Sequence, residues 1–193
     1  MPYQRTAPVF SRPFPRGAVR LSLLGAVLLL ASACSPALNW RSVRLPDAAL
    51  SLMLPCKPEQ ASRPVDWGQG PVELSLTGCE ADGATFAVSH LRLEDPSQAG
   101  AVLAQWRQAV LGRLQVPQAA VDTPFTPAGA LALPQSLRSR IEGRSPKGEP
   151  VYLQGLWFAR LEGSHARLFH VVMLSPRERT AVAVAFFEGV TLP

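Results

Sequence analysis

Alternation of hydrophobic and polar residues predicts that most of the chain after residue 40 is β-strand. The clearest case is Val72–Thr77, where Val72, Leu74 and Leu76 fall on one face and polar residues fall on the other. Proline, glycine and aspartate mark the turns between such stretches. The pattern predicts further strands at 42–45, 49–54, 84–93, 137–144, 151–161 and 167–174, with a polar strand or loop up to residue 67.

A helix is predicted after the sequence Asp95-Pro96-Ser97-Gln98, in which Asp95 can cap free backbone N–H groups and proline suits the first helical position. The hydrophobic residues that follow recur at helical spacing, so this helix should cover the sheet through a face that includes Trp106. It should end before Pro117, and the proline- and alanine-rich segment 118–134 is expected to be irregular.

A second capping sequence, Ser175-Pro176-Arg177-Glu178, predicts a short C-terminal helix over 181–187 that ends at Gly189. Val182, Ala185 and Phe186 would share its buried face. The expected fold class is therefore α+β: a single twisted antiparallel β-sheet with one long covering helix and a short C-terminal helix, all within one domain at 40–193.

The segment before this domain has the layout of an export signal. Arg16 and Arg20 precede an uncharged hydrophobic run at 21–33, which at about 13 residues is short for a membrane span of roughly 20. We therefore expect residues 1–33 to be a signal peptide. An uncharged segment extended to Trp40 would reach about 20 residues, which keeps a retained single-span anchor open as an alternative.

The run ends in Leu30-Ala31-Ser32-Ala33-Cys34, which resembles the lipobox of bacterial lipoproteins. The resemblance implies cleavage after Ala33 and lipidation of Cys34, although Ala31 departs from the leucine that is commoner at its position. Residues 34–39 would then be a short tether that holds the domain at a membrane in the cell envelope, facing the periplasm. Ordinary soluble secretion is a further alternative.

The three cysteines fit export, because an odd number in an exported protein needs an explanation. Lipid on Cys34 supplies one and leaves Cys56 and Cys79, which can oxidise to a disulfide outside the cytoplasm. Two buried free thiols are the alternative. Removal of the leader also takes away four arginines, so the net charge of +5 falls to about +1, which argues against a nucleic-acid partner.

The sequence contains no motif that identifies a catalytic, cofactor or metal site. The candidate metal ligands are His90, His165 and His170, but residues 165 and 170 are an odd number of positions apart, so on one regular strand they would point to opposite faces. Glu73, Asp82 and Glu94 are interpreted as solvated residues at strands and turns. No Gly-x-Ser-x-Gly turn, phosphate-binding glycine loop or Cys-x-x-Cys pair is present.

Both ends of the predicted domain resemble PsbP-like domains, a group of small exported α/β domains. The resemblance rests on Ala48–Pro58, a short apolar strand that ends in a Leu-Pro-x-Lys-Pro turn, and on the closing sequence 185–192. It implies an antiparallel sheet with helices against it and an accessory or assembly role. The first hypothesis is thus a non-enzymatic, lipid-anchored envelope protein with a possible protein partner, and the alternative is an envelope hydrolase or ligand-binding enzyme.

Overall fold

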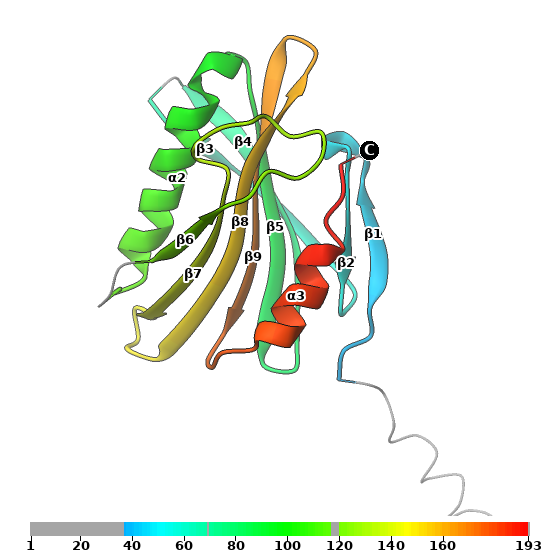
Figure 1. Cartoon of the computed structure of the whole chain (residues 1–193), viewed down its shortest axis with the longest axis vertical. Coiled ribbons are helices and arrows are strands. Elements are labelled where there is room, and N and C mark those ends of the chain that lie inside the picture. The colour runs from blue at the N-terminus through cyan, green and yellow to red at the C-terminus, as the bar shows by residue number, and fades with distance from the viewer. Residues whose placement is uncertain (1–36, 69, 117–119, 193) are drawn as a thin grey trace, which may run out of the picture. The chain divides into compact units, whose positions relative to one another are not determined.

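Seven antiparallel strands form the main sheet of the protein, in the order β3-β4-β5-β9-β8-β7-β6 (Figure 1). The structure is a computed structural model, and it describes residues 37–68, 70–116 and 120–192. The strand bounds are β3 Glu59–Asp66, β4 Pro71–Ala81, β5 Ala84–Leu93, β6 Val121–Pro124, β7 Leu137–Arg144, β8 Pro150–Glu162 and β9 His165–Ser175. Together with the helices, this sheet confirms the predicted α+β class.

Two further strands form a separate hairpin, so the prediction of a single sheet is wrong. β1 (Arg41–Leu45) pairs only with β2 (Leu50–Leu54), and the 3-10 turn η1 (Pro46–Ala48) joins them. Every second residue of β2 is a leucine whose side chain is buried against the main sheet. The hairpin therefore packs on a face of the sheet and not at its edge. The free side of β2 hydrogen-bonds through Ser51 to Thr191 near the C-terminus.

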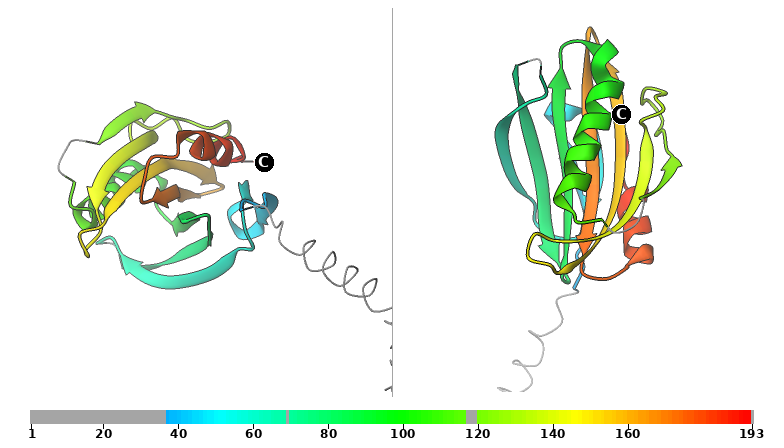
Figure 2. Two further views of the ribbon diagram at one scale, coloured as in Figure 1. Left: turned by 90° about the horizontal axis from the view of Figure 1, so that it is seen from below. Right: turned by 90° about the vertical axis from the view of Figure 1, so that its left-hand side faces the viewer.

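Helix α2 (Ala99–Arg113) lies along the strands on one face of the main sheet (Figure 2, right). The expected single long helix is instead a 3-10 turn, η2 (Pro96–Gln98), followed by this 15-residue α-helix. Asp95 caps the turn as predicted, because its side chain accepts a hydrogen bond from the Ser97 N–H at 2.9 Å. Ala99, Val102, Leu103 and Trp106 give α2 a buried stripe at helical spacing.

The opposite face of the sheet carries the β1–β2 hairpin and helix α3 (Thr180–Glu188) (Figure 1). The hydrophobic core is consequently divided by the sheet. One part joins Phe86, Phe158 and Phe169 to the hairpin and α3, and the other packs Trp106 and Trp157 beneath α2. The hairpin, α3 and α2 leave part of each face of the sheet uncovered. A cleft lies on each face.

Two details of the C-terminal half differ from the predictions. The 118–134 segment contains the edge strand β6, which Asp122 fixes through a 2.7 Å hydrogen bond from the Ser139 hydroxyl of β7. The predicted capping box before α3 does not form, because Ser175 ends β9 and donates to the carbonyl of Arg177. Ala183, Phe186 and Phe187 are the buried residues of α3, so Ala185 was placed on the wrong face.

A disulfide joins Cys56, just after β2, to Cys79 on β4, as the cysteine count predicted. It links the β1–β2 hairpin covalently to the main sheet. The predicted lipidation site Cys34, the signal peptide 1–33 and the start of the tether lie outside the described residues. The described chain meets the domain core at Leu38, and the Asn39 N–H donates to the Pro55 carbonyl at 2.8 Å.

Candidate functional site

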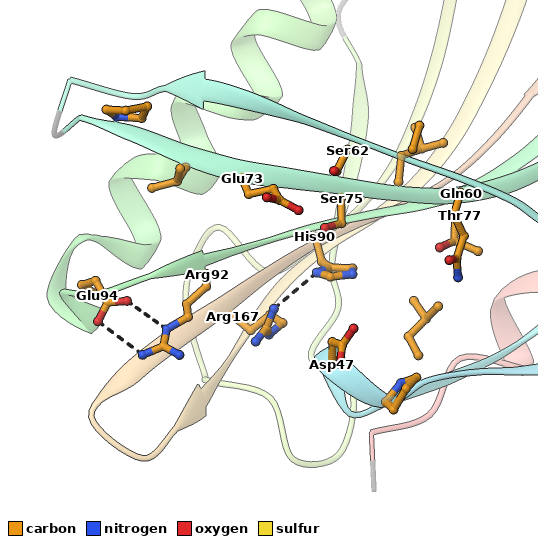
Figure 3. A pocket seen from close by; sticks show the side chains of 16 residues that line it. Asp47, Gln60, Ser62, Glu73, Ser75, Thr77, His90, Arg92, Glu94 and Arg167 are labelled. Carbon is orange, nitrogen blue, oxygen red and sulfur yellow. Dashed lines mark hydrogen bonds and ion pairs between the residues drawn. The ribbon is translucent and has the colours of Figure 1, made fainter.

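A polar cleft with a volume of about 790 Å³ lies between the η1 turn and strands β3, β4 and β5 (Figure 3). It opens on the face of the sheet that carries the hairpin. We call it the polar cleft, and its polar and charged lining residues are Asp47, Gln60, Ser62, Glu73, Ser75, Thr77, His90, Arg92, Glu94 and Arg167.

Strand register explains why residues so distant in sequence meet there. Ser62 is directly opposite Ser75, and Ser75 is directly opposite His90 on the next strand. Arg92 of β5 is likewise opposite Arg167 of β9. Opposed residues in an antiparallel ladder point to the same face, so the register alone gathers these side chains on one side of the sheet.

His90 and Arg167 line the inner end of the polar cleft, and Glu162 lies behind them and completes a chain of three polar side chains. The guanidinium of Arg167 lies 3.4 Å from Nδ1 of His90, and its Nε donates to Glu162 at 2.9 Å. A guanidinium can only donate, so Nδ1 accepts and the imidazole proton is assigned to Nε2. Burial, helped by the positive charge of Arg167, lowers the pKa of His90 to about 4, although Asp47 and Glu162 oppose the shift. His90 is therefore a neutral hydrogen-bond donor at neutral pH.

Glu162, the last residue of β8, holds Arg167 in place. Besides Arg167, its carboxylate lies 3.4 Å from His165 and 3.8 Å from Arg160. Arg160 in turn donates to the carbonyl of Ala49 at 3.0 Å, next to the η1 turn. This network connects the hairpin to the main sheet behind the polar cleft, so the position of Arg167 is set by groups outside the cleft.

The outer end of the polar cleft is held much less firmly. Arg92 and Glu94 pair at 2.9 Å there, but their side chains are 51% and 78% exposed. Exposed pairs of this kind contribute at most about 1 kcal/mol and exchange partners readily. A bound ligand can therefore recruit either charge, whereas the inner His90–Arg167–Glu162 chain stays in place.

The second concave site is an apolar groove of about 420 Å³ on the opposite face, between α2 and strands β3, β4 and β9. We call it the α2 groove. Leu74, Leu76, Val110 and Val172 are among its apolar lining residues, and Leu76 is 42% exposed. Arg63 and Arg113 line the same groove, and both are exposed.

His170 lies at the floor of the α2 groove, stacked on Trp157 and in edge contact with Trp106. Its Nε2 atom is buried and has no hydrogen-bond partner within the described residues. Burial lowers the pKa of His170 to about 3, so the ring is neutral at neutral pH. His170 therefore contributes an uncharged aromatic ring to the floor of the groove.

The three candidate histidines do not converge. His90 lines the polar cleft, His170 lies on the opposite face under α2, and His165 contacts Glu162 beside the β8–β9 turn. Residues 165 and 170 point to opposite faces of β9, as their odd spacing predicts. Among the described residues, no group of three or more His, Cys, Asp or Glu side chains is placed to hold a metal ion.

Sequence reasoning missed the polar cleft. Glu73 and Glu94 are exposed, as predicted, but the prediction did not show that both also line a cleft. The alternating polar residues Glu73, Ser75 and Thr77 of β4 were the available signal, because they mark a face of the sheet that is not packed with hydrophobic residues. Their proximity to Arg167 depends on strand pairing, and their proximity to Asp47 depends on packing of the β1–β2 hairpin against the sheet. Local sequence shows neither.

The chain matches no protein-family model and no curated protein. In the described part of the chain, no helix has both the length and the hydrophobicity needed to span a membrane. Two features of the protein bear on its function: the two concave sites and the hydrophobic run that ends at Cys34.

Proposed function

We propose that this chain is an exported envelope protein, anchored by lipid on Cys34 with its domain facing the periplasm, and that it acts by binding a protein partner in the polar cleft. The proposal rests on His90 and Arg167, two hydrogen-bonding groups at the inner end of an open cleft that Glu162 holds in place from outside it. Preformed polar groups of this kind reduce the entropic cost of binding.

Export is supported by the Cys56–Cys79 disulfide, because disulfides persist mainly in oxidising compartments. With this pair joined, Cys34 is the one remaining cysteine in the sequence, and it follows the hydrophobic run 21–33. The accessory nature of the proposed role follows the resemblance of residues 48–58 and 185–192 to PsbP-like domains.

Binding is favoured over chemistry by the state of His90. A general base should have a pKa near the working pH, but the pKa of His90 is about 4 and its Nδ1 already faces Arg167. Among the described residues, no serine, threonine or cysteine side chain is hydrogen-bonded to a histidine. At neutral pH the cleft therefore offers hydrogen-bond donors, acceptors and charges for recognition.

An envelope hydrolase is the second candidate, and one observation favours it. His90 shares the polar cleft with the carboxylates of Asp47 and Glu73, which is the combination that an acid–base site would use. Turnover of ester or amide substrates that is lost in His90→Ala but kept in His165→Ala would establish this candidate and overturn the binding proposal.

Site-specific photo-crosslinking in the native envelope tests the binding proposal. A benzophenone amino acid at exposed Ser62, on the rim of the polar cleft, is compared with the same group at exposed Gln108 on α2. We expect a protein crosslinked at position 62 and not at 108. Absence of a crosslink specific to position 62 would overturn the proposal.

The anchor is tested separately through Cys34. We expect the intact mass of the membrane-extracted protein to begin at Cys34 and to include acyl chains, and we expect Cys34→Ala to abolish the acylated form. A mature protein that retains residues 1–33 would establish the single-span alternative. An unmodified soluble form would establish ordinary secretion.

A further inference from the structure

We propose that the α2 groove binds a single-chain anionic amphiphile, a long-chain fatty carboxylate, with the alkyl chain in the groove and the carboxylate at Arg63 and Arg113. This site lies on the opposite face of the sheet from the polar cleft and takes a different class of ligand. It goes beyond the proposed function and does not depend on it.

The groove is lined in a way that suits an alkyl chain. Leu74 and Val172 are almost fully buried in its floor, while Val110 of α2 and Leu76 of β4 form parts of its sides that water can reach. Its volume of about 420 Å³ lies within the usual range of roughly 300–1,000 Å³ for small-molecule sites. An apolar ligand would remove the exposed surface of Leu76 from water, which favours binding.

The floor of the groove adds no charge that would oppose an alkyl chain. His170 is 6% exposed and stacks on Trp157, with the ring centroids 3.6 Å apart. Because burial keeps its pKa near 3, the ring stays neutral across the physiological pH range. Ser89, which is 7% exposed, is the other polar residue of the floor.

Two arginines at the groove indicate that the head group of the ligand is negatively charged. Arg63 and Arg113 line both the α2 groove and an adjoining cavity of about 270 Å³ that includes Trp67 and Asp66. Neither arginine takes part in any ion pair of the described residues. The carboxylate of Asp66 accepts a hydrogen bond from the Gly68 N–H at 2.7 Å. Two arginines that form no ion pair with a described residue, beside an apolar groove, complement a carboxylate, which guanidinium groups bind in bidentate geometry.

Photo-labelling of the full-length protein in its native membrane tests this inference. The probe is a palmitic-acid analogue that carries a diazirine in the chain and a terminal alkyne, and labelled peptides are mapped by mass spectrometry. We expect labels on peptides that contain Leu76 and Val110. The methyl ester of the same probe, which lacks the negative charge, should label these peptides about tenfold less.

Two sets of substitutions test the binding of the carboxylate and of the alkyl chain separately. Arg63→Gln with Arg113→Gln should reduce labelling by the acid about tenfold, whereas Arg44→Gln with Arg177→Gln removes the same charge elsewhere and should leave it unchanged. Ala61→Trp fills the groove from the exposed strand β3, and Thr123→Trp on exposed β6 is its control. Circular dichroism and the intact Cys56–Cys79 disulfide establish that each variant is folded.

Several outcomes would overturn the proposal. Labelling confined to residues 1–36 would show that the probe only partitions with the N-terminal segment. Equal labelling by the acid and the ester, or no effect of Ala61→Trp, would show that the groove does not recognise the amphiphile. A crosslink between two copies of the chain, or between the groove and residues 21–33, would show that a protein segment occupies the groove instead.

Discussion

The imidazole of His170 lies flat on the indole of Trp157, with ring centroids 3.6 Å apart and ring planes within 7° of parallel. The two residues are directly opposed on β9 and β8, and both are buried beneath α2. Protonation of His170 would place a charge in this aromatic environment without a partner. Protonation of His90 is also unfavourable, because the side chain is buried and lies beside the positive charge of Arg167.

The first prediction is that the protein loses stability in mild acid. The pKa values of His90 and His170 are about 4 and about 3 in the folded protein but near 6.5 in the unfolded chain. Below pH 6.5 the unfolded chain binds protons that the folded protein does not, so the free energy of unfolding falls by up to about 1.4 kcal/mol per pH unit for each histidine. Urea denaturation between pH 7 and pH 4.5 measures this slope.

His170→Phe is the matched variant for the pH prediction. Phenylalanine keeps an aromatic ring on Trp157 and removes the unpaired Nε2 atom, so the variant should be at least as stable as the parent at pH 7. It should also lose about half of the acid-dependent slope. An unchanged slope would contradict the assignment of the slope to His170.

The second prediction concerns the disulfide between Cys56 and Cys79, which are 23 positions apart. Replacement of both cysteines by serine should lower the free energy of unfolding by about 3 kcal/mol, because the unfolded chain gains the entropy of an open loop. Urea titrations of the two proteins measure the difference. Addition of a reductant to the parent protein should reproduce it, and a parent that is insensitive to reductant would contradict the prediction.

The third prediction compares two ion pairs. Asp122 of β6 accepts hydrogen bonds from Arg107 of α2 at 2.6 Å and from the buried Ser139 at 2.7 Å. Asp122→Ala leaves both donors without their acceptor and should destabilise the protein by about 1–3 kcal/mol. Glu94→Ala, which breaks the exposed pair with Arg92, should change stability by less than about 0.5 kcal/mol. Equal effects of the two substitutions in urea titrations would contradict the prediction.

The fourth prediction uses two glycines with opposite surroundings. A Cβ atom on Gly78 of β4 would lie 2.6 Å from the carbonyl oxygen of Phe86 and 2.9 Å from Ala87, so Gly78→Ala should destabilise by about 1–3 kcal/mol. A Cβ on Gly112 of α2 would have no atom within 4 Å, and alanine favours a helix more than glycine does. Gly112→Ala should therefore raise the melting temperature, and Gly78→Ala should lower it.

The features predicted well from sequence are those that neighbouring residues determine. The polar and apolar alternation predicted β7 at 137–144 with the same ends as in the structure, and the Asp82-Gly83 turn follows from its two residues. Asp82 and Gly83 both have positive φ, as a tight hairpin turn of this type requires. The buried stripe of α2 was likewise evident from its spacing.

The features that sequence missed depend on long-range contacts. Strand β6 is formed by a polar segment whose Asp122 is held by Arg107 and Ser139, which are 15 and 17 positions away. Asp47 of η1 and Arg167 of β9 both line the polar cleft, although they are far apart in the sequence. No local pattern distinguishes such residues from ordinary solvated ones, because their neighbours are set by strand order and by the packing of the hairpin and of α2 on the sheet.

The two edge strands of the main sheet, β3 and β6, have features that disfavour strand pairing between neighbouring molecules. Each outer strand contains a proline, Pro64 or Pro124, and charge is present on both, as Asp122 on β6 and as three charged residues on β3. Proline cannot donate a ladder hydrogen bond, and charged side chains on an edge strand disfavour its burial against another strand, so both features hinder growth of the sheet from one molecule to the next. Such protection matters most for proteins crowded in two dimensions, where a lipid anchor would hold many copies side by side with their sheet edges within reach. Anchored as we propose, the domain would therefore resist aggregation into fibres even at high density on a bilayer.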